Sequence, residues 1–162
     1  MLYLDHAATS PVRPEALEAM LPYLTERYGN PSSHHTVGEA AAAALADARA
    51  KVAAVLGVRT NEVVFTSGGT EADNLAIKGL AIGAALRRDS RRSRGSPVHV
   101  ITTPIEHEAV LASCDYLERV HGFDITLVPV DDTGAIDPAD VAAAIRPETA
   151  VVSIGYANNE IG

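Results

Sequence analysis

The run Ser67-Gly68-Gly69-Thr70 has the clearest chemical potential in the chain, because it stands between an apolar segment and a predicted helix that opens with Glu71. The first N–H groups of a helix lack intrahelical acceptors, and the helix dipole favours an anion at that end. Glycines let a phosphate approach the backbone, and the Thr70 hydroxyl adds a donor. The run therefore predicts a phosphate site, although a tight turn that only needs glycine gives the same pattern.

The same run differs from the common nucleotide-binding loops. A Walker loop has a lysine directly before its Ser or Thr, and the dinucleotide fingerprint has a third glycine deeper in the helix. Residues 67–71 have neither feature. We therefore expect a phosphorylated cofactor rather than a nucleotide.

Histidine and cysteine offer other chemistry. His107 precedes a predicted helix, where an imidazole could stack by its flat face and titrate near neutrality, but such a histidine, taken alone, more often bonds only to solvent. His34 and His35 are adjacent, so their side chains diverge, and no metal-ligand spacing occurs. We expect no metal site. Cys114, the single cysteine, lies inside a predicted helix, where a thiol is usually a small buried hydrophobe.

Alternating strands and helices must position these residues. Pro14 suits a first helical turn, and Pro22 predicts a kink or an early break. Thr36 and Glu39 form a capping box before a helix that ends at Gly57. The remaining predicted elements are a short strand or arm at residues 2–4, strands at 63–66, 98–103, 125–130 and 150–156, helices at 37–56, 71–86, 106–121 and 137–145, and a turn at 131–134.

Short links between strands and helices imply parallel pairing with right-handed crossovers. The segment 150–156 is apolar on both faces, as in a central strand covered by helices on each side. We therefore predict an α/β fold of three layers, in which a mainly parallel sheet is flanked by helices. Since a central strand needs neighbours and few residues follow it, we expect the fold to be incomplete in this chain.

Composition and charge exclude several classes. A net charge of -8 would repel a phosphate backbone, so we expect no direct nucleic-acid partner. The chain has no signal peptide and no apolar run long enough to cross a bilayer, and its one cysteine cannot form an internal disulfide. We therefore expect a cytoplasmic protein without a membrane partner. Residues 87–96 hold five of the 13 Lys and Arg residues, which favours a solvated surface loop over a docking patch.

Five motifs in family order make the chain resemble cysteine desulfurases, which belong to the class V aminotransferase group of fold-type I pyridoxal-phosphate enzymes. The resemblance runs from Tyr3 to Gly162. The motifs are Tyr3-Leu4-Asp5-His6-Ala7-Ala8-Thr9, Gly29-Asn30-Pro31-Ser32-Ser33, Phe65-Thr66-Ser67-Gly68-Gly69-Thr70-Glu71-Ala72-Asp73-Asn74-Leu75-Ala76, Glu106-His107-Glu108-Ala109-Val110 and Asn158-Asn159-Glu160-Ile161-Gly162.

This resemblance implies roles for individual residues. Gly69 and Thr70 match the pair that holds the phosphate of pyridoxal 5'-phosphate. His107 matches the histidine that stacks over the cofactor ring and can move protons, which makes it the predicted catalytic residue. Asn159 matches the asparagine that hydrogen-bonds near the ring hydroxyl. Asn30 lies in a loop near the mouth of the site, and we assign it no direct role.

The resemblance also implies a reaction, in which sulfur leaves L-cysteine to give L-alanine and an enzyme persulfide for iron–sulfur scaffold or tRNA-thiolation partners. It further implies a homodimer. The family's Schiff-base lysine, the aspartate that pairs with the pyridine nitrogen and the nucleophilic cysteine are expected beyond Gly162, because Lys51, Lys78 and Cys114 match none of them.

We accordingly expect residues 1–14 to form an N-terminal arm. Residues 15–162 would form the first part of the large cofactor-binding domain, inactive by itself. Two alternatives stay open on the sequence: another fold-type I enzyme, such as an aminotransferase or a selenocysteine lyase, or a non-catalytic truncated homologue.

Overall fold

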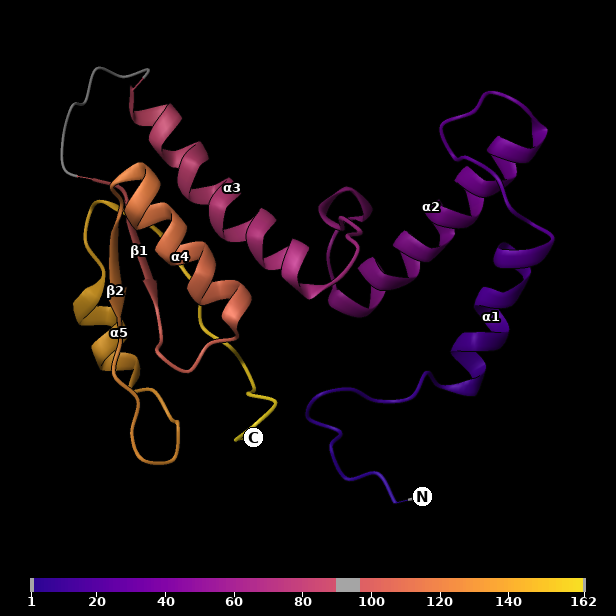
Figure 1. Cartoon of the computed structure of the whole chain (residues 1–162). Coiled ribbons are helices and arrows are strands. Elements are labelled where there is room, and N and C mark those ends of the chain that lie inside the picture. The colour runs from indigo at the N-terminus through magenta and orange to yellow at the C-terminus, as the bar shows by residue number, and fades with distance from the viewer. Residues whose placement is uncertain (1, 90–96, 162) are drawn as a thin grey trace. The chain divides into compact units, whose positions relative to one another are not determined.

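The computed structural model describes residues 2–89 and 97–161. The chain divides into two compact units, residues 1–65 and 66–162 (Figure 1). The first unit contains helix α1 (Pro14–Thr25), helix α2 (Thr36–Leu56) and the short 3-10 helix η1 (Thr60–Glu62). Residues 2–13 form no helix or strand, so the short strand considered for residues 2–4 is not formed.

Helix α1 starts at Pro14 as predicted, and of the kink or early break expected at Pro22 the early break does not occur. The helix continues to Thr25. Its last turn is closed by the Glu26 and Arg27 N–H groups, which donate to the Pro22 carbonyl at 2.9 and 2.7 Å. Proline lacks a backbone N–H but keeps its carbonyl, so Pro22 can still accept the hydrogen bonds of the following turn.

The apolar residues of α1 have the predicted helical spacing, yet they pack against little within the first unit. None of its residues is buried, and Leu17, Met20, Leu21 and Leu24 are between 50% and 67% exposed. The spacing of the apolar residues thus predicted helix α1 correctly. The apolar face of this helix stays exposed within the first unit.

Helix α2 corrects the predicted capping box. His35, not Thr36, is the N-cap residue, because its ring Nδ1 accepts a hydrogen bond from the Gly38 N–H at 3.2 Å. A side-chain acceptor of this kind satisfies one of the helix's free N–H groups. The predicted stop is confirmed: Gly57 has a φ of 67°, a left-handed conformation that glycine adopts without a steric cost.

The strand predicted at residues 63–66 is also wrong. Val63 is extended, but residues 63–66 pair with no strand in the part of the chain that the structure describes. The Val63 carbonyl instead accepts from Arg49 Nε at 3.2 Å, and the Arg49 guanidinium lies 5.4 Å from the centre of the Phe65 ring. A short apolar run predicts extended backbone, but a strand also needs a partner.

The second unit alternates helices and strands. It contains α3 (Gly69–Asp89), β1 (His99–Thr102), α4 (Glu108–His121), β2 (Asp124–Leu127), α5 (Pro138–Ala144) and β3 (Thr149–Val152). Gly122 ends α4 with a φ of 66°, and Asp137 caps α5 by accepting from the Ala139 N–H at 2.8 Å. Asp131 closes the predicted turn at residues 131–134, since it accepts from Thr133 and Ala135 N–H.

The three strands form a parallel sheet in the order β2-β1-β3. Helices α3 and α4 lie on one side of this sheet and α5 lies on the other (Figure 1). The predicted three-layer α/β architecture is therefore confirmed for this unit. Residues 90–96, which include most of the predicted basic loop, lie outside the described residues.

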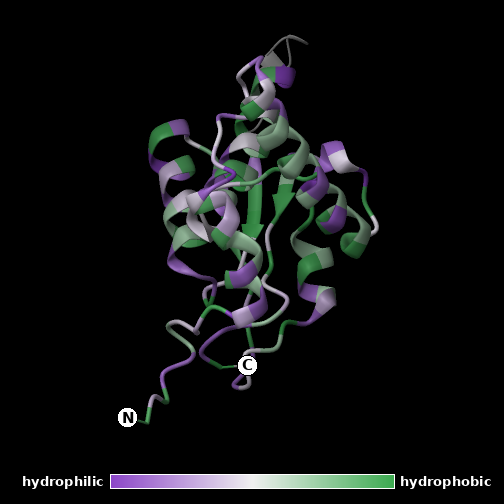
Figure 2. Cartoon of the chain, turned by 90° about the vertical axis from the view of Figure 1, so that its right-hand side faces the viewer, coloured by the Kyte–Doolittle hydropathy of each residue, from purple (hydrophilic) through white to green (hydrophobic). Residues whose placement is uncertain are grey.

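The most buried of the described strands is β1, and the segment predicted as central lies at the edge of the described sheet. All four residues of β1 are buried, and the strands appear mostly hydrophobic in Figure 2. The predicted strand at 150–156 is shorter, at Thr149–Val152, and within the described residues β1 is its one strand neighbour. Apolarity on both faces predicted burial, but it could not decide which strand takes the middle position.

The main core lies between the sheet and the α3–α4 layer. Ile77 and Ala81 of α3 meet Val110 and Leu117 of α4 in one buried cluster with Val100 of β1. Burying each large aliphatic side chain contributes about 1.5–3 kcal/mol. This packing holds the two helices against the strands. None of the described helices combines the length and apolarity needed to cross a membrane.

A buried histidine ties the three strands together. The ring nitrogens of His99, a residue that is 1% exposed, lie 2.8 Å from the hydroxyl oxygens of Thr149 in β3 and Thr126 in β2. Burial lowers the pKa of His99 from its usual 6.5, and the positive charge of Arg146 lowers it further. The nearby carboxylates of Asp124 and Glu148 oppose this shift.

This lowered pKa predicts that the protein loses stability in mild acid. Below pH 6.5 the unfolded chain binds a proton at His99 that the folded chain refuses, so stability falls as the pH drops from 6.5 towards the folded pKa. We expect the wild-type midpoint of thermal unfolding to fall more between pH 7.5 and 5.5 than that of His99→Gln. The exposed-site variant His34→Gln should keep the wild-type pH profile, and equal pH profiles for wild type and His99→Gln would contradict the assignment.

Candidate functional site

The start of α3 is organised by a carboxylate. Glu71 Oε2 accepts from the Ser67 backbone N–H at 2.7 Å and from the Ser67 hydroxyl at 2.6 Å. These two bonds, the hydroxyl first, lower the pKa of Glu71. The first α-helical bond runs from the Ala72 N–H to the Gly68 carbonyl at 3.1 Å. The loop before the helix is therefore held in place while the N–H groups of Gly69 and Thr70 point away from the helix body.

The two glycines in this loop leave open space. A Cβ added at Gly68 or Gly69 would meet no atom within 4 Å. Neither residue has a positive φ, so neither backbone strain nor internal packing requires glycine there. The open space would let an external group approach the backbone closely. Together with the exposed Thr70 hydroxyl, the helix start has the donors and the room that an anion needs.

His107 follows β1 and is the N-cap residue of α4. Its Nδ1 accepts from the Ala109 N–H at 3.1 Å, so the helix starts at Glu108 and not at Glu106 as predicted. Because Nδ1 is an acceptor, the proton of the neutral ring lies on Nε2. The residue is exposed, which leaves the Nε2–H and a ring face accessible. Because its ring bonds to the first turn of α4, His107 is not a histidine whose hydrogen bonds go only to solvent.

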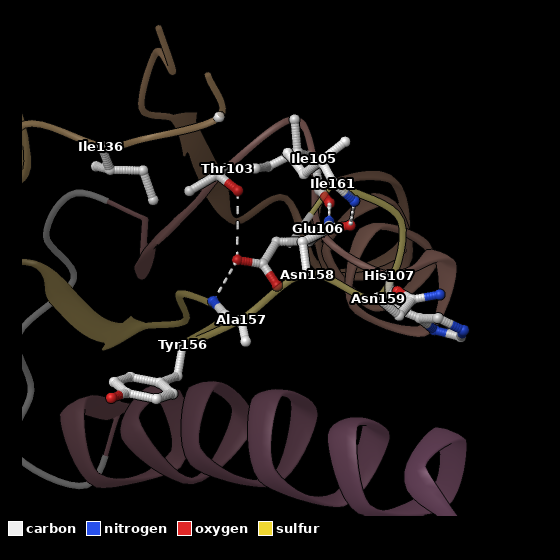
Figure 3. A pocket seen from close by; sticks show the side chains of 12 residues that line it. Thr103, Ile105, Glu106, His107, Ile136, Tyr156, Ala157, Asn158, Asn159 and Ile161 are labelled. Atoms are coloured by element: carbon white, nitrogen blue, oxygen red, sulfur yellow. Dashed lines mark hydrogen bonds between the residues drawn. The ribbon is translucent and has the colours of Figure 1, made fainter. Parts of the chain in front are cut away.

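Asn159 belongs to the segment that follows β3, and it lines a pocket together with His107. The pocket has a volume of about 150 Å³ and also includes Thr103, Glu106 and Tyr156. In Figure 3 the side chains of His107 and Asn159 lie at the same end of it, away from Ile136. Two predicted site residues from segments about 50 positions apart are therefore brought together.

Gly69 and Thr70 do not line this pocket, but they begin α3 at the same end of the unit. Figure 1 shows α3 and α4 packed together with both N-termini at the end where β1 finishes. In parallel sheets the loops at the carboxyl ends of the strands form the usual ligand site. The described arrangement is of this kind. The predicted residues thus lie on three segments that meet one edge of the sheet.

Sequence reasoning missed the residues that join these segments. Glu106 Oε1 accepts from the Gly155 N–H at 2.7 Å and from the Thr103 hydroxyl at 3.3 Å. Asn158 Nδ2 donates to the Ile105 carbonyl at 2.9 Å. Both residues stand directly before a predicted site residue, and their polar type after a buried strand was the available signal.

The other residues considered for chemistry have structural partners. Lys51 forms a salt bridge with Asp47 at 2.7 Å within α2. Lys78 Nζ donates to Asn74 Oδ1 at 2.5 Å and lies 4.5 Å from the centre of the Tyr116 ring. No group of three His, Cys, Asp or Glu residues suited to a metal occurs among residues 2–89 and 97–161.

Asn30, in the first unit, shapes its own loop. Its side-chain oxygen accepts from the Ser32 N–H at 2.9 Å, and its carbonyl accepts from the Ser33 N–H at 3.0 Å. These bonds account for the residue locally, and they give it a structural role within the loop.

Comparison with known proteins adds a family to this geometry. Residues 2–162 match the family model described as Aminotransferase class-V. The chain is 47% identical over 161 residues to a cysteine desulfurase IscS of Dictyoglomus turgidum, which covers 99% of this chain and 38% of that protein. It is 49% identical to a cysteine desulfurase IscS of Methanosarcina thermophila, over 99% of this chain and 37% of that one. The chain thus spans about two fifths of the length of these curated relatives.

Solved structures agree in fold. A NifS-like protein gives a TM-score of 0.84 at 40% identity, over 98% of this chain and 41% of that one. A structure described as SspA in complex with cysteine gives a TM-score of 0.85 at 40% identity, over 98% of this chain and 43% of that one. The resemblance to cysteine desulfurases inferred from the five motifs is confirmed.

Cys114 is predicted to be unreactive in the folded protein. It is buried in α4, and burial, with a smaller effect of the Glu106 charge, raises the pKa of its thiol to about 11. Since the thiolate is the reactive form, iodoacetamide at pH 8 should modify Cys114 slowly in native protein and rapidly in urea. Peptide mass mapping measures this at Cys114 itself, and fast native modification would show that the thiol is accessible.

Proposed function

Because the chain belongs to the class-V aminotransferase family, we propose that it forms the N-terminal part of a pyridoxal-phosphate-dependent cysteine desulfurase. The observation that carries this proposal is the gathering of the open start of α3, His107 and Asn159 at one edge of the second unit. Relatives at 47% and 49% identity that bear the name cysteine desulfurase support it. On this proposal residues 1–14 are an N-terminal arm, and residues 15–162 belong to the large cofactor-binding domain.

Gly69 and Thr70 would hold the phosphate of pyridoxal 5'-phosphate. The open space at Gly68 and Gly69 fits a phosphate, because no protein atom lies within 4 Å of the position that a Cβ would take at either residue. The N–H groups of the first helical turn and the Thr70 hydroxyl would donate to the phosphate oxygens. The helix dipole would add to the attraction. When bound, the cofactor supplies an electron sink for the substrate carbon.

His107 and Asn159 would act on the ring side of the same site. The exposed imidazole of His107 suits stacking against a flat ring, and its Nε2–H can donate a hydrogen bond towards that ring. The bond from Ala109 to Nδ1 keeps the ring orientation fixed, and a proton transfer at Nε2 would require Nδ1 to release this bond and carry the other ring proton. Asn159 would present an amide to the ring hydroxyl region, close to where a substrate carboxylate would lie.

The proposed substrate is L-cysteine. A cysteine thiolate of the enzyme attacks the substrate sulfur and keeps it as a persulfide, while the carbon–sulfur bond breaks and the carbon gains a proton to give L-alanine. The solved structure of SspA, described as a complex with cysteine, supports this substrate class. The lysine that carries the cofactor, the aspartate that pairs with its ring nitrogen and the nucleophilic cysteine would lie in the portion of the relatives that this chain does not span.

The remaining features of the proposal concern partners. We propose a cytoplasmic homodimer that passes sulfur to a scaffold or acceptor protein for iron–sulfur cluster assembly or tRNA thiolation. Relatives named IscS support this assignment. The proposal includes no metal and no nucleic acid as a direct ligand of this part of the chain.

Cofactor retention tests the phosphate site. In the full-length protein, Thr70→Ala removes one hydrogen bond to a charged group, which is worth about 1.5–3 kcal/mol, so the cofactor should dissociate at least about tenfold more readily. Equilibrium dialysis followed by cofactor absorbance measures the change. Thr133→Ala, a hydroxyl in the turn at residues 131–134, is the matched control and should leave retention unchanged. If Thr70→Ala retains the cofactor like the wild type, the phosphate site lies elsewhere.

Alanine and sulfide release test the activity. With a thiol reductant, the full-length protein should convert L-cysteine to equal amounts of L-alanine and sulfide. His107→Ala should lower the rate by about 10²–10⁴-fold, the usual range for lost acid–base catalysis. Cys114→Ser should leave it nearly intact, because a buried thiol is poorly ionised.

Other outcomes would decide against parts of this proposal. Transamination without sulfide would favour another enzyme of the same fold, and activity on selenocysteine alone would favour a selenocysteine lyase. Loss of activity in Cys114→Ser with cofactor still bound would make Cys114 the nucleophile. Full activity in His107→Ala would remove the role given to that ring.

A further inference from the structure

We propose that Glu106 is a positioning residue, which fastens the segment carrying His107 to the segment carrying Asn159. The inference deepens the proposed function and rests on it for its chemical consequence, whereas the fastening itself rests on the contacts alone. His107 and Asn159 lie on loops after two different strands, and a ligand held by both needs a constant spacing between them. The contacts of Glu106 supply that constraint.

Glu106 is anchored on one side to the most buried part of the sheet. Its Oε1 accepts from the hydroxyl of Thr103 at 3.3 Å, and Thr103 follows β1 directly and is fully buried. The carboxylate is itself half-buried. A carboxylate that is bonded to a buried residue at the end of β1 has few available conformations. A second group bonded to the same carboxylate is therefore held at a fixed position relative to β1.

On the other side Glu106 reaches the backbone after β3. The same oxygen accepts from the Gly155 N–H at 2.7 Å, a short distance typical of charge-assisted bonds. A Cβ at Gly155 would lie 3.3 Å from Glu106 Oε2, which is tight. Glycine at this position therefore lets the carboxylate approach the backbone closely, and the loop gains a fixed point three residues before Asn158.

A second bond runs between the same two segments in the opposite direction. Asn158 Nδ2 donates to the Ile105 carbonyl at 2.9 Å, while its Oδ1 accepts from the Glu160 N–H at 2.8 Å and the Ile161 N–H at 3.2 Å. Figure 3 shows the bonds of Glu106 and the bonds of Asn158 to Ile105 and Ile161 in the pocket that His107 and Asn159 also line. Glu106 and Asn158 each stand directly before a proposed site residue, so their bonds fix the two site residues relative to each other.

Amide hydrogen exchange in the cofactor-free full-length protein tests the fastening without any activity. Glu106→Ala should raise the exchange rate of the Gly155 amide by about tenfold or more, because it loses a bond to a charged acceptor. Glu106→Gln keeps a neutral acceptor oxygen and should raise the rate less. Glu108→Ala is the matched control: this carboxylate lies two residues further on and has no bond to either loop among the described residues. It should leave the Gly155 rate unchanged.

Steady-state kinetics of the cofactor-loaded enzyme test the consequence. Glu106→Ala should lower kcat/KM for L-cysteine by about tenfold or more, with partial rescue in Glu106→Gln. Unchanged Gly155 exchange in Glu106→Ala, or an equal rise in Glu108→Ala, would overturn the fastening. Faster exchange with unchanged kinetics would overturn the positioning role.

Two further results keep the test decisive. If Glu106→Ala does not fold, Glu106→Gln must by itself raise Gly155 exchange above the wild-type and Glu108→Ala values, or the proposal fails. If the wild-type protein neither binds pyridoxal 5'-phosphate nor releases sulfide, the proposed function fails while the exchange measurement still decides the fastening.

Discussion

The parallel pairing of β1 with both β2 and β3 is the constraint on which the site depends. In a parallel sheet every strand ends at the same edge, so the loops that follow β1 and β3 must emerge side by side. His107 and Asn159 are carried by these two loops. Antiparallel pairing of either neighbour would send one loop to the opposite edge and separate residues that now line one pocket.

Packing within the second unit brings the start of α3 to the same edge as these two loops. The buried contacts between α3 and α4, centred on Ile77 and Leu117, hold the two helices on one face with their N-termini at the same edge. Helix starts offer free N–H groups and a favourable dipole for anions. The fold therefore sets a helix start with free N–H groups at the same end of the unit as the polar pocket, and His99 joins the three strands through Thr126 and Thr149.

The two units differ in how much apolar surface they cover. The second unit has a closed cluster of buried aliphatic side chains, whereas in the first unit the apolar face of α1 stays exposed. Burial of such a face is what stabilises most helices in proteins. The proposed site accordingly lies in the second unit, where packing determines the side-chain positions.

The sequence by itself determined the features that local physics controls. Glycine ends α2 at Gly57 and α4 at Gly122, and the run at Gly69 marks the start of α3, because these signals act within a few residues. Only the tertiary structure decided that β1 is the buried middle strand, that residues 63–66 pair with no strand among the described residues, and that Glu106 bonds Gly155. The last contact joins residues 49 positions apart, and no local pattern encodes it, since it follows from which strands pair.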